Sequence, residues 1–144
     1  MENKVIPDRK KKRFVMGIVS GVVLLALSAI GLYATSWLFP SIAMQYFDPA
    51  FDTESSKIIL YYLHPFVISF ALAWFWGRFK GTLTGSFFTR GIEFGLIYVR
   101  IATIPMLWLI YSSMHVSLPM VGTWLILALA QGLISGLIFE KMDP

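Results

Sequence analysis

Four long apolar stretches, separated by short polar segments, dominate the pattern of hydrophobic and polar positions along the chain. We predict a helix in each, at about residues 14–39, 58–79, 87–112 and 120–139. An α-helix needs about 20 apolar residues to cross the hydrocarbon core of a bilayer, and these stretches have that length. Inside that core the backbone must satisfy its own hydrogen bonds, which favours helices. The expected fold class is therefore all-α, an integral membrane bundle of four helices.

The composition agrees with a membrane domain and leaves no room for a separate soluble one. Of the 144 residues, 57% are hydrophobic and only 14% are charged, whereas about a quarter of the residues of soluble domains are charged. We expect a polar, basic segment over residues 1–13, followed by a single four-span domain over residues 14–144.

The distribution of Lys and Arg predicts how the helices are oriented. A basic run at residues 9–13 precedes the first helix, whereas Lys57 is the only Lys or Arg in the two outer loops, of which residues 40–57 form the larger. Basic residues are retained in the cytoplasm, so we expect both termini there, in a multi-pass protein of the cell membrane, which in a bacterium is the inner membrane. The basic run could also bind anionic lipid headgroups.

Pairs of glycines four residues apart occur in three of the predicted helices, in the half nearer the cytoplasm. The pairs are Gly17 and Gly21, Gly91 and Gly95, and Gly132 and Gly136. Such Gly-x-x-x-Gly faces let helices approach closely in a membrane. We expect them to pack the inner half of the bundle tightly and to leave a looser, aromatic outer half. A homodimer or a partner interface is the alternative use of these faces.

The third predicted helix carries charges within its apolar stretch. Arg90 and Glu93 are three residues apart and Glu93 and Arg100 are seven apart, so all three point broadly the same way. Gln131 and Ser69 lie at about the depth of Arg100, which predicts a polar cluster in the middle of the membrane. Two interpretations follow: a polar pathway with Glu93 as proton carrier or counter-ion, or a buried Arg–Glu pair that fixes the packing of the helices.

Two prolines and two histidines complete the set of candidate positions. Pro65 and Pro105 lie inside apolar stretches, where proline usually kinks a helix. His64 and His115 both lie toward the predicted outer side and are weak candidates for a metal or haem site. We expect no metal and no cofactor, because a histidine beside a kinking proline more often hydrogen-bonds a freed carbonyl.

The chain lacks the motifs of most catalytic and nucleic-acid-binding proteins. It has no cysteine, so thiol chemistry and thiolate metal sites are excluded. It has no HExxH sequence, no phosphate-binding loop and no arrangement of nucleophile and base. The net charge of +4 comes largely from the N-terminal run and indicates topology rather than nucleic-acid binding. A non-enzymatic role is favoured over an enzymatic one.

Three functional hypotheses remain. The first is an accessory or assembly subunit, packed through the glycine faces and bound to a larger membrane protein or to further copies of itself. The second is a component of a transporter or channel for protons or small anions that uses Glu93 and Arg100. The third is a protein that binds or modifies lipids at the inner membrane surface.

Overall fold

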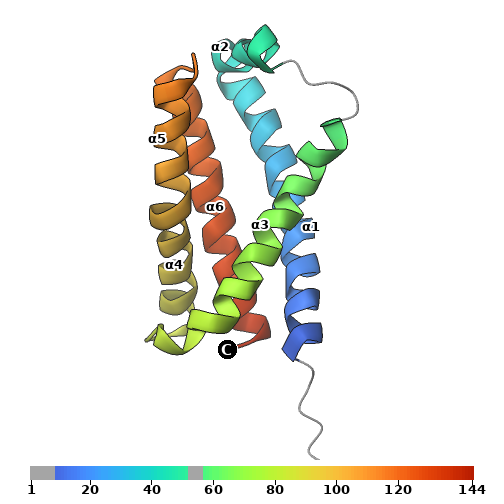
Figure 1. The fold of residues 1–144 in the computed structure, drawn as a ribbon, viewed down its shortest axis with the longest axis vertical. Helices are drawn as coiled ribbons and strands as arrows, with labels where there is room; N and C mark the ends of the chain where they lie inside the picture. Colours follow the sequence, from blue (N-terminus) through green and yellow to red (C-terminus); the bar gives the residue numbers. More distant parts are fainter. Residues whose placement is uncertain (1–8, 52–56) are drawn as a thin grey trace, which may run out of the picture.

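The computed structural model describes residues 9–51 and 57–144, and every regular element in these ranges is helical (Figure 1). The main helices are α1 (Arg9–Leu38), α3 (Ile58–Phe79), α4 (Phe87–Tyr98), α5 (Ile104–Ser113) and α6 (Leu118–Met142). The short elements are α2 (Pro40–Ala43), η1 (Met44–Phe47), η2 (Pro49–Phe51), η4 (Lys80–Thr82) and the π-helical η5 (Val99–Thr103). Because η5 joins α4 to α5 without interruption, the elements form four helices that are long and apolar enough to span a membrane.

The expected all-α class with four long apolar helices is confirmed, with differences at the boundaries. The first helix already includes Arg9, the first described residue, instead of starting at residue 14, because Lys and Arg are good helix formers and continue the helix into the basic run. The last helix covers Leu118–Met142 instead of 120–139; its N-cap is Ser117, whose hydroxyl accepts the Met120 N–H at 3.3 Å. Residues 1–8 and 52–56 of the predicted basic segment and outer loop lie outside the described ranges.

The bundle consists of two helix pairs. α1 packs mainly on α3, α4 packs mainly on α6, and contacts between α1 and α6 join the pairs. At the lower end of Figure 1, which we call the base, α1 begins, η4 connects α3 to α4, and α6 ends. At the upper end, which we call the top, α2, η1 and η2 lie beside the turn between α5 and α6. α3 crosses α1 obliquely and leads away from α5 toward the top.

The hydrophobic core lies near the base. Its buried members are Met16, Leu72, Ala73, Trp76, Leu83, Phe94 and Phe139. The ring centroid of Phe94 lies 5.1 Å from that of Trp76 and 6.0 Å from that of Phe139, which is the range of favourable aromatic contacts. These rings come from α3, α4 and α6, and they hold the base of the bundle together.

The glycine pairs lie inside the bundle. A Cβ atom at Gly95 would approach the backbone nitrogen of Leu133 to 2.6 Å, and one at Gly132 would approach the carbonyl oxygen of Gly95 to 3.1 Å. Gly91 and Gly136 meet in the same way. On α1, the glycines at 17 and 21 lie against the rings of two phenylalanines of α3. All six glycines are buried, so close helix approach explains their positions.

The π-helical η5 keeps one row of side chains directed inward. Gly91, Gly95, Val99, Thr103 and Leu107 are spaced by four residues, and all are buried. In a regular α-helix, residues four apart differ by about 40° in direction around the helix axis, because a turn has 3.6 residues. The wider π turn reduces this difference. It also precedes Pro105, which has no N–H to continue the α-helical hydrogen-bond pattern.

The top is held by a smaller aromatic group. The Trp124 indole N–H donates to the Tyr46 hydroxyl at 2.6 Å, and the ring of Phe51 lies 6.4 Å from that of Trp124. These contacts attach the segment that contains η1 and η2 to α6.

Candidate functional site

Several buried polar side chains inside the bundle are hydrogen-bonded to one another or to the backbone. The Ser69 hydroxyl donates to the Gly17 carbonyl at 2.8 Å, and the Gln131 amide donates to the Ser28 hydroxyl at 3.0 Å. The hydroxyls of Ser20 and Ser135 lie 3.0 Å apart in a hydrogen bond between α1 and α6. These bonds join α1 to α3 and α6, which is the structural use of buried polar groups in a bundle.

Arg90, at the base, is held by a carboxylate, a carbonyl and an aromatic ring. Its Nη1 donates to Glu140 Oε1 at 2.6 Å, and its Nη2 donates to the Lys80 carbonyl at 3.1 Å. The guanidinium lies 5.9 Å from the ring centroid of Trp76. The side chains of Arg90 and Glu140 are only 18% and 6% exposed. This largely buried ion pair joins α4 to α6 at the base.

A second ion-pair group surrounds Asp143 at the C-terminal end of α6. Its Oδ1 lies 2.6 Å from Lys12 Nζ and 2.9 Å from Lys80 Nζ. Partial burial raises the pKa of Asp143, but the hydrogen bonds from Lys12 and Lys80 outweigh it, so the pKa lies below its ordinary value. A cavity of about 230 Å³ beside these ion pairs is lined by Arg9, Lys12, Arg13, Gly77, Lys80 and Asp143.

Glu93 and Arg100 point out of the bundle. Both side chains are exposed, and neither makes a hydrogen bond or ion pair with any of the residues that the structure describes. Their neighbours Ile92, Ile101 and Ile104 are exposed as well. We call this surface of α4, η5 and α5, defined by these five residues, the outward face. It is an apolar surface with one negative and one positive charge.

The predicted cluster of Arg90, Glu93, Arg100, Gln131 and Ser69 is therefore not assembled. Arg90 pairs with Glu140 instead of Glu93, and Arg100 lies away from the interior where Gln131 and Ser69 find their partners. Glu93 is two residues from each glycine of its helix, which places it about 200° around the helix from the side that packs on α6. Glu140 was not among the predicted site residues, because it lies one residue beyond the predicted end of the last helix at residue 139.

The two prolines lie in different surroundings. Pro65 is buried, and α3 continues on both sides of it. Pro105 is exposed and lies directly after η5. The Thr103 hydroxyl, at the end of η5, is buried and has no hydrogen-bond partner among the described residues. The change of helical pattern is thus tied to Pro105, and the sequence alone did not locate it.

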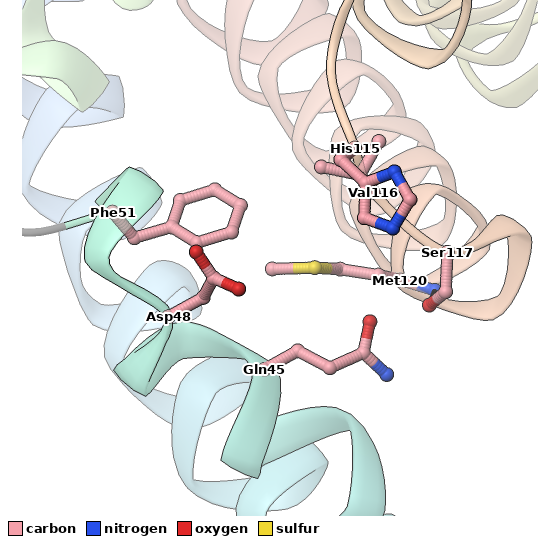
Figure 2. A pocket seen from close by; sticks show the side chains of 7 residues that line it. All are labelled: Gln45, Asp48, Phe51, His115, Val116, Ser117 and Met120. Atoms are coloured by element: carbon pink, nitrogen blue, oxygen red, sulfur yellow. Dashed lines mark hydrogen bonds between the residues drawn. The ribbon is translucent and has the colours of Figure 1, made fainter.

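A pocket of about 250 Å³ opens at the top between η1, η2 and the turn before α6 (Figure 2). Asp48 and His115 face it from opposite sides, and the Met120 side chain reaches between them. The other candidate histidine, His64, is exposed on α3 and does not line this pocket. Within residues 9–51 and 57–144, no three side chains of the types that bind metals gather into one group.

We take the outward face as the candidate functional site. Its two charges lie inside an apolar segment and have no partner within the described chain. Such a surface can bind a complementary surface, and neither of the two cavities described above is lined by its residues. A comparison of the chain with family models, curated proteins and solved structures finds no match. We therefore infer the function from the residues and their geometry.

Proposed function

We propose that the four long helices span a membrane, with both termini in the cytoplasm, and that the protein is an accessory or assembly subunit of a larger membrane protein. The partner covers the outward face. The apolar length of the four helices supports the membrane location. The gathering of Arg9, Lys12, Arg13 and Lys80 at the base supports the orientation, because basic residues are retained on the cytoplasmic side.

The position of Arg100 carries this proposal. It lies thirteen residues from Phe87 and thirteen from Ser113, at the centre of the third spanning segment. With a hydrocarbon core about 30 Å thick, a residue at the centre is about 15 Å from either headgroup region, which exceeds the reach of an arginine side chain. A charge at this depth costs from about 2.5 to more than 10 kcal/mol when it faces lipid. A protein that covers Arg100 removes this cost.

The glycine faces are not the surface through which this subunit binds its partner. The six glycines contact neighbouring helices of the same chain, so they explain how the bundle packs. The partner is bound by the opposite side of α4, where Glu93 lies. The proposed subunit therefore packs its own helices through the glycine pairs and binds its partner through the outward face.

The transport hypothesis has less support from this geometry. Glu93 and Arg100 are exposed and do not line the interior of the bundle, where buried serine hydroxyls and the Gln131 amide are hydrogen-bonded to each other and to backbone. A pathway along these two residues would need the partner to supply its other wall.

Binding of an anionic lipid at the base is a second candidate function, supported by the cavity that Arg9, Lys12, Arg13 and Lys80 line. Each cation near an anionic surface contributes about 1 kcal/mol. We expect phosphatidylglycerol to raise the unfolding temperature in nanodiscs relative to phosphatidylcholine, and Lys12→Gln to reduce this difference. Lys141→Gln, an exposed position outside the cavity, is the control. Equal unfolding temperatures in both lipids would contradict lipid binding.

Native gel electrophoresis of gently solubilised membranes tests the subunit function. We expect the wild-type chain, of 16.3 kDa, to migrate in a larger complex and Arg100→Gln to migrate as the free protein. Arg78→Gln is the matched control, because Arg78 is exposed at the base, where it lies over the ring of Trp74. A wild-type chain that migrates alone, or a complex unchanged by Arg100→Gln, would contradict the proposal.

A further inference from the structure

We infer that the partner is a different polypeptide whose transmembrane helix presents a carboxylate to Arg100, at the middle of the membrane, and a hydrogen-bond donor or cation to Glu93. This inference rests on the proposed function and specifies the chemistry of the partner. It follows from the positions of the acidic residues in this chain, from the depth of Arg100, and from the spacing of the two charges on the outward face.

A second copy of the chain does not supply the carboxylate. Among the four long helices, Glu93 and Glu140 are the only acidic residues. Both lie nearer the base than Arg100 does, and Glu140 already pairs with Arg90. Copies inserted in the same orientation place equal residues at equal depth. No copy therefore offers a carboxylate at the level of Arg100, and a two-fold contact would bring like charges together.

An inverted copy would be complementary to the outward face, because Glu93 of one chain would then lie near Arg100 of the other. However, this arrangement requires half of the molecules to carry the basic group at the base to the outer side. The concentration of Lys and Arg at that end favours a single orientation.

Lipid does not supply the carboxylate or a substitute for it. Lipid phosphates lie at the headgroup level, about 15 Å from the centre of the hydrocarbon core. Carboxyl groups in general can exist in a protonated, uncharged form, whereas a guanidinium group stays charged. Arg100 therefore determines the partner more strongly than Glu93, and a carboxylate that accepts two of its N–H groups is the complementary group.

The spacing of the two charges predicts a pattern in the partner helix. Glu93 and Arg100 are seven residues apart, an axial distance of about 10 Å. The partner should then carry an Asp or Glu at the centre of a transmembrane helix, and a Lys, Arg or polar donor about seven residues nearer its cytoplasmic end. The exposed Ile101 and Ile104 beside Arg100 would exclude water and lipid headgroups from the paired charges.

Photo-cross-linking in the native membrane tests this inference. A photoreactive amino acid at Ile101 is expected to cross-link to a second protein, within one helical turn of a mid-membrane Asp or Glu. The same group at Ile30, exposed on α1, is the control and should not label that helix. Arg100→Glu should reduce the yield of the complex at least tenfold, and exchange of the partner's carboxylate for Arg should restore it in that variant.

The outcomes separate this inference from the proposed function. Two outcomes would overturn the inference and leave the subunit function intact. One is cross-linking to a partner helix that lacks an acidic residue, and the other is a charge exchange that does not restore the complex of the Arg100→Glu variant. Cross-linking only to a second copy would overturn the inference, because the occupant would be this chain. The absence of any protein cross-link from Ile101 would overturn the proposed function itself.

Discussion

Arg90 and Arg100 lie on the same continuous helix, ten residues apart, in opposite surroundings. The base supplies Arg90 with the Glu140 carboxylate, the Lys80 carbonyl and the Trp76 ring. On the outward face, Arg100 has no hydrogen-bond or ion-pair partner from the described chain, and it is exposed beside isoleucines. One arginine is thus part of the fold, and the other is available to something outside it. A charge within an apolar helix should therefore be classified by the groups that surround it.

Removal of the Glu140 carboxylate should have the largest effect on the isolated protein. Glu140→Gln leaves the Arg90 guanidinium buried without a carboxylate, and breaking a buried pair costs about 3–5 kcal/mol. Glu93→Gln makes the same chemical change on the outward face, where no described residue is its partner, and we expect a change within about 0.5 kcal/mol. Unfolding of both variants in the same detergent measures the difference. Equal losses of stability in the two variants would contradict the distinction between a paired charge at the base and an unpaired charge on the outward face.

The packing side of α4 gives the next largest expected effect. Gly95→Ala places a methyl group against backbone atoms of α6, and overpacking of this type costs about 1–3 kcal/mol. Gly122→Ala, on α6, is the matched control, because nothing lies within 4 Å of the added carbon. Urea or thermal unfolding in detergent should separate the two variants. A neutral Gly95→Ala would mean that the close approach of α4 and α6 does not contribute to stability.

The ion pairs of Asp143 should give the smallest effect. Because its pKa is lowered in the folded protein, its contribution is fully present above its ordinary pKa, near 3.8, and is lost as the pH falls through the folded value. Lys12 is 44% exposed, so we expect less than about 1 kcal/mol. The loss of stability between pH 6 and pH 3 should be smaller for Asp143→Asn than for the wild type. Identical losses would show that these pairs contribute nothing.

The sequence predicts the four helices because long apolar stretches with small residues at four-residue spacing have few other solutions. It also contains the signal that Glu93 points outward. If Gly91 and Gly95 face a neighbouring helix, a residue two positions from each lies on the other side. The spacing of the charged residues among themselves favoured an internal cluster, whereas their spacing from the glycines indicates the outward side.

Three features are harder to predict, and two of them depend on contacts between distant segments. The partner of Arg90 is fifty residues away, at the end of α6, where the apolar pattern had already stopped. The bond between Ser20 and Ser135 had a possible signal, because the two serines occupy equal places in the similar sequences GIVSG and GLISG. The η5 segment has only Pro105 as a local cue.

Native mass spectrometry of the protein released gently from its own membrane tests most directly whether a different protein covers the outward face. We predict a complex of this chain with a second, different polypeptide, which is lost in Arg100→Gln and kept in Arg78→Gln. Detection of the wild-type chain only as a monomer or as a homo-oligomer would contradict the account, because Arg100 would then be accommodated in the membrane without a partner's carboxylate.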